Sequence, residues 1–266
     1  MIEAWVTGVG VRGPGLDGWA SSRAILTGEQ PYEPREVALP PLALLSSTER
    51  RRAGPVARLA MLVAAEACEG AGLAPGALRS VFGSSNGDGA VVTGILEAVS
   101  GADQQVSPTQ FHNSVHNAAA GYWSIGTGSA QPATCLGAYD GTFAASLLKA
   151  MAELRAERAP VLLCVYDAPL PEPLARLRPT GAAFGVGLVL TPDSAGAALA
   201  RLRVAYQPDP SPAGDDAARH PGLSLLSQAN PAARALRLLE ALARREPDAF
   251  STGLAGGTLR IEIARA

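Results

Sequence analysis

Two neighbouring segments, FHNSVHNAAAGYW at residues 111–123 and PATCLGAYDGTF at residues 132–143, decide the expected fold. In the first, small and apolar side chains predict a helix over residues 114–125. In the second, an apolar run predicts a central, buried strand over residues 133–139, and apolar positions at helical spacing predict a helix over residues 142–155. The strand and the second helix meet at Asp140, where the helix dipole favours a negatively charged group.

Strands and helices are expected to alternate along the rest of the chain, which predicts an α/β layered fold. Loops are expected at residues 31–41 and, where Pro, Asp and Gly dominate, at residues 207–222. Residues 258–264 alternate between apolar and polar side chains, as a half-exposed edge strand would. The remaining expected strands are 2–9, 81–85, 161–166, 181–190 and 199–206, and the remaining helices are 16–26, 55–70, 91–99 and 231–245.

Composition excludes several classes of function. The chain has 266 residues, is 47% hydrophobic and carries a net charge of −2, so a basic surface for nucleic acid is not expected. No apolar run approaches the roughly 20 residues of a membrane span, and the first residues do not resemble a signal peptide. Three widely spaced cysteines, Cys68, Cys135 and Cys164, lie in apolar segments and predict reduced, buried thiols of a cytoplasmic protein.

Several motifs carry a family resemblance. The segments VTGVG (6–10), GPGL (13–16), GSSNG (83–87) and the RP pair at 178–179 before residues 181–190 resemble β-ketoacyl synthases. The tract at residues 111–123 is similar to the short chain-length-factor-like proteins of aryl polyene and type II polyketide pathways. The resemblance implies the N-terminal half of a thiolase-like fold, a mixed five-stranded sheet flanked by helices. Residues 1–206 would form this domain, and residues 207–266 would complete it with a loop, a helix and a strand.

The chain departs from the family pattern in two ways. When residues 117, 121 and 132 are aligned with the family, Asp140 takes the position at which ketosynthases have a cysteine and type II chain length factors have glutamine. The catalytic histidines of the family come from a second half, whereas only about 60 residues follow Gln207 and they contain one histidine, His220. The ketosynthase site therefore cannot be completed within this chain, which predicts a protein that is not itself a condensing enzyme.

Asp140 and Cys135 leave alternatives open. Asp140 is expected to be an ordinary N-cap that accepts hydrogen bonds from the amides of Thr142 or Phe143, and a catalytic carboxylate is the alternative. Cys135 is expected to be a buried strand residue, but a gapped alignment would move it into the nucleophile position. A residual acyl-thioester hydrolase or decarboxylase that uses Cys135 or Asp140, including a Cys–His–Asp triad with His112, remains a second hypothesis.

The predicted function is that of a non-catalytic, chain-length-factor-like subunit that pairs with an active β-ketoacyl synthase as a heterodimer. A half-fold would leave an apolar face uncovered, and such a face implies a partner. An acyl carrier protein is a possible further partner for the basic helix at 231–245, with Arg234, Arg237, Arg244 and Arg245, and a free-standing homodimeric binding protein is the alternative. No cofactor and no metal are expected, although His112 and His116 are four residues apart. The residues expected to line the substrate tunnel or the partner surface are Phe111, His112, Asn113, His116, Tyr122, Trp123 and Phe143.

Overall fold

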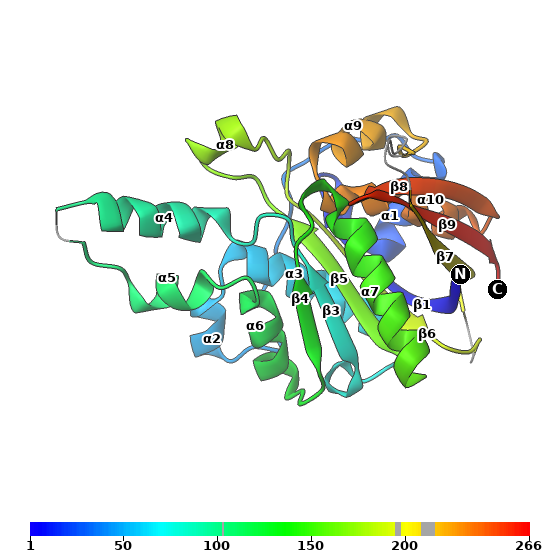
Figure 1. The fold of residues 1–266 in the computed structure, drawn as a ribbon, viewed down its shortest axis with the longest axis horizontal. Helices are drawn as coiled ribbons and strands as arrows, with labels where there is room; N and C mark the ends of the chain where they lie inside the picture. Colours follow the sequence, from blue (N-terminus) through cyan, green and yellow to red (C-terminus); the bar gives the residue numbers. More distant parts are fainter. Residues whose placement is uncertain (103, 195–197, 209–215) are drawn as a thin grey trace.

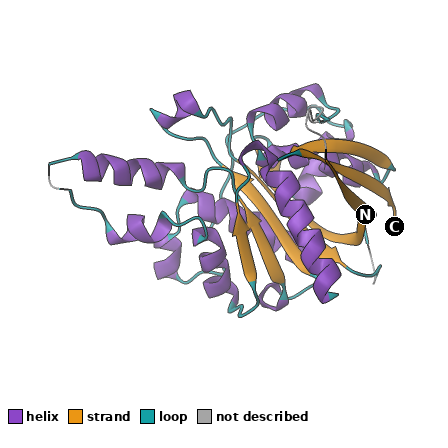
Figure 2. Ribbon diagram, in the orientation of Figure 1, coloured by secondary structure: helices purple, strands orange, loops and turns teal. Residues whose placement is uncertain are grey.

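A computed structural model of the protein describes residues 1–102, 104–194, 198–208 and 216–266 (Figures 1 and 2). Within these residues the strands form one nine-stranded sheet in the order β4-β3-β5-β6-β1-β7-β9-β8, with β2 paired to β1. The strands are β1 (Ile2–Gly13), β2 (Leu16–Asp17), β3 (Arg79–Gly83), β4 (Ala133–Leu136), β5 (Val161–Asp167), β6 (Phe184–Thr191), β7 (Ala200–Pro208), β8 (Asp248–Leu254) and β9 (Gly257–Arg265).

Helices surround the sheet. The α-helices are α1 (Trp19–Thr27), α2 (Ser47–Arg52), α3 (Pro55–Ala71), α4 (Gly89–Ser100), α5 (Pro108–Asn113), α6 (Ala118–Thr127), α7 (Thr142–Glu157), α8 (Leu174–Leu177), α9 (Pro221–Ala229) and α10 (Leu236–Arg244). Short 3₁₀ turns are η1 (Pro75–Ala77), η2 (Tyr139–Gly141) and η3 (Ala232–Ala235). The helix α4 and the shorter α5 run side by side away from the body of the molecule (Figure 1), and we call this pair the arm.

The strands β4, β3, β5, β6 and β1 form the mixed five-stranded sheet that the resemblance implies. The strands β4, β3 and β5 are parallel, with Phe82 opposite both Cys135 and Cys164, and β6 and β1 follow as antiparallel neighbours. The carboxyl ends of β3, β4 and β5 therefore meet at one edge of the sheet. Ligand sites of open α/β sheets lie at that edge, and it holds the residues that the resemblance singles out.

Glycines allow α3 to lie directly against the sheet. A Cβ atom added at Gly10 would approach Val63 O to 2.1 Å, and one added at Gly187 would approach the same oxygen to 2.2 Å. Two neighbouring strands, β1 and β6, thus offer a flat surface to the backbone of α3. Glycine within a strand permits such a close approach of a neighbouring backbone.

The C-terminal segment corrects one prediction. We expected a half-fold to leave an apolar face uncovered, but β7, β8, β9, α9 and α10 share one buried core with β1, β5, β6 and α7. Leu236, Leu239 and Phe250 belong to this core, together with Phe143 of α7. The last residues cover the face because their apolar side chains point toward α7 rather than toward solvent.

Two strands have positions that differ from the prediction. The strand β4 was expected at the centre of the sheet, but it is a partly exposed strand at one end of the strand order, next to β3. The element that precedes it in the chain is the helix α6. The strand β9 was expected at the edge, but it lies between β7 and β8, which forms the other edge. Both errors have the same cause, because an apolar or alternating pattern reports burial of faces and not the number of neighbouring strands.

Three helical segments also differ from the prediction. The helix expected from residue 114 begins at Ala118, and the expected turn at residues 107–109 begins the short helix α5. Part of the loop expected at 207–222 is β7, which ends at Pro208, and α9, which begins at Pro221. Residues 209–215 of that loop lie outside the described residues.

A substitution tests the close packing of α3. Gly187→Ala places a methyl group onto the backbone oxygen of Val63, which cannot move without shifting α3, so we expect a loss of unfolding free energy of more than about 2 kcal/mol. The control is Gly121→Ala, on the solvent side of α6, where an added Cβ meets nothing within 4 Å. Urea denaturation measures both variants, and equal stabilities for the two would contradict the packing described here.

Candidate functional site

Residues 137–141, which we call the elbow, connect β4 to α7. They carry Asp140 beside the carboxyl ends of the parallel strands. Asp140 does not cap α7: the N-cap is Gly141 and makes no side-chain cap, so the expected capping role is wrong. Instead the Asp140 carboxylate lies 2.6 Å from Arg178 Nη1 and 3.7 Å from Arg234 Nη2. Pairs between a carboxylate and a guanidinium group are charge-assisted, so these contacts stabilise the carboxylate in place of a helix cap.

Arg178 fixes the elbow from several sides. Its guanidinium lies 3.5 Å from the ring centroid of Tyr139, and its Nη2 donates to Ser85 Oγ at 2.8 Å. The side chain of Arg178 is 17% exposed, so it is largely withdrawn from water, whereas Asp140 is 44% exposed. Tyr139 adopts a positive φ of 52°, a conformation that a non-glycine residue holds only where the surroundings enforce it. Arg178 therefore joins the elbow to the loop after β3.

Asp167, at the end of β5, organises that loop. Its Oδ1 accepts hydrogen bonds from Ser84 Oγ at 3.0 Å, from the Ser85 amide at 2.8 Å and from the Asn86 amide at 3.2 Å. The residue is completely buried, and its Oδ2 has no hydrogen-bond partner among the described residues. Burial raises the pKa of Asp167 to about 6, although these hydrogen bonds and Arg178 oppose the shift.

Sequence reasoning missed Asp167 and Arg178 as parts of the site. The segment GSSNG and Arg178 entered the sequence analysis only as parts of family motifs. The available signal was an acidic residue directly after an apolar strand, at the edge where the strand ends meet. The pairing of Asp140 with Arg178 had no such signal, because the two residues are far apart in the sequence.

The cysteines lie away from the elbow. Cys135 lies on β4, five positions before Asp140, and burial raises the pKa of its thiol. It lines a surface groove of about 300 Å³ between β4 and α6, together with Asn117, Ala120, Gly121, Ser124 and Ala133. Burial also raises the pKa of Cys68 to about 12, and it raises that of Cys164 well above its usual range. A raised pKa leaves little thiolate at neutral pH, so these thiols are weak nucleophiles.

The three histidines are engaged outside a catalytic constellation. The ring nitrogen Nε2 of His116 lies 2.9 Å from Ser84 O and donates to it, and His112 makes an edge contact with Tyr122 at 5.8 Å between ring centroids. His220 caps α9, where its Nδ1 accepts from the Gly222 amide. No hydrogen bond joins Cys135 to a histidine among the described residues. Within the same residues no three His, Cys, Asp or Glu side chains form a group that could hold a metal ion.

The other predicted site residues divide into exposed and buried sets. Phe111 is 69% exposed on the arm, whereas Asn113 is buried, donates to Arg52 O at 2.9 Å and accepts from Tyr122 Oη at 2.9 Å. Tyr122, Trp123 and Phe143 are fully buried inside the chain's own core. These three bulky side chains therefore do not reach the surface, because Tyr122 and Trp123 lie in the buried core that contains α3, and Phe143 lies in the core that α7 forms with the C-terminal segment.

The basic helix near residue 240 also differs from the prediction. Arg237 Nε lies 2.7 Å from Asp248 Oδ2, and Arg234 contacts Asp140. Both side chains are less than one-fifth exposed. Arg234 and Arg237 are therefore not part of the free basic face that we expected for a carrier protein on Arg234, Arg237, Arg244 and Arg245.

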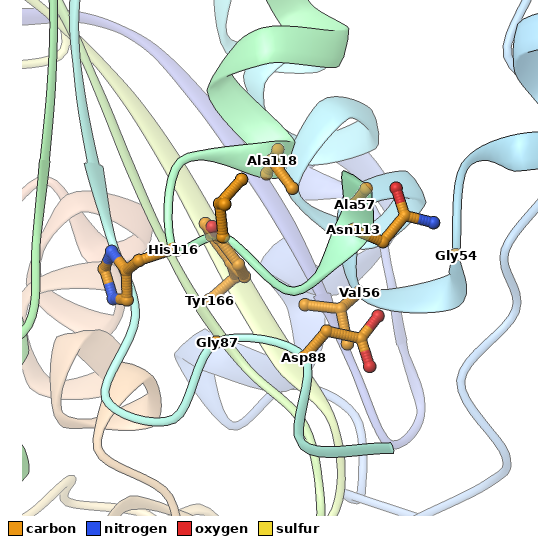
Figure 3. Close-up of a pocket in the computed structure, with 11 residues that line it drawn as sticks. Gly54, Val56, Ala57, Gly87, Asp88, Asn113, His116, Ala118 and Tyr166 are labelled. Carbon is orange, nitrogen blue, oxygen red and sulfur yellow. The ribbon is translucent and has the colours of Figure 1, made fainter. Parts of the chain in front are cut away.

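A small cavity lies where the arm joins the body (Figure 3). It has a volume of about 20 Å³, room for about one water molecule. Asp88, His116 and Tyr166 surround it, and the first turns of α3 and α6 form its wall. Asp88 caps α4 by accepting from the Val91 amide at 3.2 Å, and burial raises the pKa of its carboxyl group. The cavity is too small for an acyl chain.

These features define a class of protein: a thiolase-like sheet whose nucleophile elbow carries a paired carboxylate. The family model for the N-terminal domain of β-ketoacyl synthases matches residues 27–236. The chain therefore belongs to the β-ketoacyl synthase family, in agreement with the resemblance of its motifs. No curated protein sequence matches the chain.

Solved structures with the same fold include ketosynthase complexes. A chain of the ketosynthase ApeO in complex with its chain length factor ApeC, from Xenorhabdus doucetiae, is 19% identical with a TM-score of 0.73, and the match covers 100% of both chains. A chain of AntDE:AntF, a type II acyl carrier protein in complex with its ketosynthase, is 11% identical with a TM-score of 0.76, covering 100% of this chain and 99% of the other. A chain of the ishigamide ketosynthase/chain length factor is 13% identical with a TM-score of 0.71, and 99% of each chain is covered.

None of the described helices has the length and apolar character needed to cross a membrane.

The buried carboxyl group predicts a pH dependence of stability. Because the pKa of Asp167 is about 6 in the folded chain, above its ordinary value of 3.8, the folded state binds this proton more tightly. Its contribution to stability is complete below about pH 4 and is lost as the pH rises through 6, a difference of roughly 3 kcal/mol. Asp167→Asn removes this titration. Chemical denaturation from pH 4 to pH 7 should show wild type losing stability relative to the variant, and parallel pH profiles would contradict the assignment.

Proposed function

We propose that the chain is a non-catalytic, chain-length-factor-like subunit that pairs with an active β-ketoacyl-ACP synthase in polyketide or fatty-acid-type chain elongation. Family membership supplies the fold on which the proposal rests. Two of the similar structures are described as ketosynthases with chain length factors, which supports a role of that kind. A more specific role in aryl polyene synthesis rests on the resemblance of residues 111–123.

The observation that carries the proposal is the ion pair between Asp140 and Arg178. A condensing enzyme needs a thiolate at the helix tip to hold the growing acyl chain, and this chain offers a carboxylate there. An acyl group on a carboxylate would be a mixed anhydride, which water hydrolyses readily. Arg178 also engages the carboxylate at 2.6 Å, and attack on a thioester would require that pair to break. The condensation reaction would then take place at the elbow of the partner synthase.

A partner can bind along β4 and α6. The strand β4 is an edge strand of the sheet, so within the described part of the chain no strand lies beside its outer backbone groups. Exposed edge strands pair readily with a further strand. On α6, next to this edge, Ile125 is 57% exposed, and the arm adds the exposed side chains of Leu96, Val99 and Phe111. We call β4, α6 and the arm the partner face, and its apolar character suits a permanent interface.

The arm is the part of the partner face that would reach the partner's acyl chain. Figure 1 shows it extending away from the sheet, so it can contact a second subunit beyond the edge of β4. Phe111 and His112 are exposed on it, and Asn113 ties its base to α2 through Arg52 O. We assign Phe111, His112 and His116 to the wall that limits chain length. Tyr122, Trp123 and Phe143 would support that wall from the core.

We place this function in the cytoplasm, because all three cysteines are free thiols.

Alkylation separates this role from a residual hydrolase. Burial raises the pKa of the Cys135 thiol, so we expect modification by iodoacetamide at pH 7 to be slower than that of an exposed cysteine with an ordinary pKa of about 8.5. Mass spectrometry of tryptic peptides measures the rate, and the unfolded chain in urea provides the fast reference. Rapid and selective labelling of Cys135 in the folded chain would favour the hydrolase.

Co-expression tests the proposed pairing. We expect the chain to co-purify with the β-ketoacyl synthase of its native host as a heterodimer, and Ile125→Arg to weaken that complex by at least tenfold, because it places a charge in the apolar partner face. The matched control is Leu225→Arg on α9, which is similarly exposed at 69% but lies outside the partner face. Analytical ultracentrifugation measures both. A soluble homodimer that ignores the synthase would contradict the proposal.

A further inference from the structure

The arm depends on its base for its orientation. Its helices α4 and α5 pack mainly against each other, and in the described part of the chain no other helix or strand makes more than slight contact with either. Figure 1 shows both helices extending away from the sheet. The helix α4 is rich in apolar residues, yet only Gly89 and Thr93 are buried on it. The direction of the arm is therefore determined by the contacts that its ends make with the body.

Asn113, the last residue of α5, connects the arm to two helices of the body. Its Nδ2 donates to Arg52 O at 2.9 Å, and its Oδ1 accepts from Tyr122 Oη at 2.9 Å. Arg52 ends α2, and the last carbonyl groups of a helix have no partner within the helix itself. Among the described residues, no other side chain of α4 or α5 hydrogen-bonds to α2 or α6. One amide group thus sets how α5 meets both helices.

The partners of Asn113 hold it in one position. Tyr122 is 1% exposed and lies in the buried core that contains α3, so its hydroxyl cannot follow a moving arm. Asn113 itself is 8% exposed. Hydrogen bonds of buried polar groups are costly to leave unmade, because water does not replace the lost partner. Both bonds therefore resist a change in the direction of α5.

The other end of the arm has no comparable tie. Asp88 uses its carboxylate to cap α4 itself, by accepting from the Val91 amide at 3.2 Å. Both Asp88 and Asn113 line the small cavity in Figure 3, so a gap separates the two ends of the arm there. His116 donates to Ser84 O, but it lies beyond the end of α5. Asn113 is therefore the residue through which the body fixes α5.

The exposed Phe111 responds directly to Asn113. Residues two apart in an α-helix lie about 200° apart around its axis, so Phe111 points away from the side of α5 that Asn113 buries. Phe111 is 69% exposed, in agreement with this geometry. A tilt or rotation of α5 would therefore carry Phe111 into or out of the space beside the arm.

We propose that Asn113, held by Tyr122 and Arg52, is a positioning residue that sets the chain length for which the arm leaves room. The inference rests on the proposed function, in which Phe111 belongs to the wall that limits chain length. Asn113 is buried and acts through Phe111, without touching the acyl chain. Loss of either hydrogen bond allows α5 to yield, and growing chains then pass the point at which the wall stops them.

The orientation of the arm can be measured in the full chain without a partner. Double electron–electron resonance measures the distance between nitroxide labels at Ser100→Cys on α4 and Arg155→Cys on α7, two exposed positions. The native thiols react slowly, because burial raises their pKa values. Tyr122→Phe removes one hydrogen bond of Asn113, and Asn113→Asp removes the other. We expect each to widen the distance distribution about twofold, because one of two ties at the base is lost.

Tyr206→Phe is the matched control. It removes the same kind of hydroxyl group, which bonds to Ala255 O at 3.1 Å, from β7 outside the arm. This variant should keep the distance distribution and the products of wild type. Wild-type distributions in both Tyr122→Phe and Asn113→Asp would overturn the inference, whatever the partner does.

Reconstituted elongation with the partner synthase tests the effect on products. In heterodimers that remain intact in ultracentrifugation, Tyr122→Phe and Asn113→Asp should give chains longer by at least one extension unit, at a rate within about threefold of wild type. Unchanged chain length from an arm that moves would overturn the inference and leave the proposed function standing. Loss of the heterodimer in both variants would assign Asn113 to assembly and also overturn it. A wild-type chain that forms no heterodimer would contradict the proposed function, and with it the effect on chain length.

Discussion

The carboxylate of Asp140 is held at the tip of α7 by Arg178, and this ion pair connects otherwise separate parts of the site. Arg178 follows α8 and also contacts Tyr139 and Ser85. Its side chain therefore connects the segment after α8 to the elbow and to the loop after β3. Asp167 supports the same loop from the end of β5. The tip of α7 is therefore a structural junction, and the carboxylate of Asp140 is paired within the chain itself.

The C-terminal segment explains how so short a chain forms a closed core. The strands β7, β9 and β8 extend the sheet beyond β1, and α10 packs against α1 with its leucines in the same buried core as α7. The end of β8 reaches the elbow, where a Cβ atom added at Gly141 would lie 3.1 Å from Gly253 O. This segment occupies the side of α7 that would otherwise be open. The apolar surface that remains for a partner is consequently on the opposite edge, at β4, α6 and the arm.

Much of the fold could be predicted from the sequence, because local patterns determined it. The motifs GSSNG and FHNSVHNAAAGYW, with the glycine-rich strand before Leu190, identified the family and the mixed sheet. The order of strands at the two edges could not be predicted, since burial patterns do not reveal which neighbour a strand has. The site was predicted in part: Asp140 was placed at the elbow, whereas its partner Arg178 and the buried Asp167 depend on contacts between distant segments. The burial of Tyr122, Trp123 and Phe143 could not be predicted, because it depends on packing against α3 in the first two cases and against the C-terminal segment in the third.

In the proposed function, the partner synthase carries out the condensation and this chain forms the wall that limits chain length. A reconstituted elongation assay tests that division most directly. In the heterodimer, Asp140→Asn keeps the size of the side chain and removes its charge, so we expect elongation to continue at a rate within about threefold of wild type. Replacing the partner's own nucleophilic cysteine by alanine should abolish elongation. The opposite result, in which Asp140→Asn stops elongation while the heterodimer remains intact and the partner still loads its acyl group, would show that this carboxylate takes part in the reaction and would contradict the account.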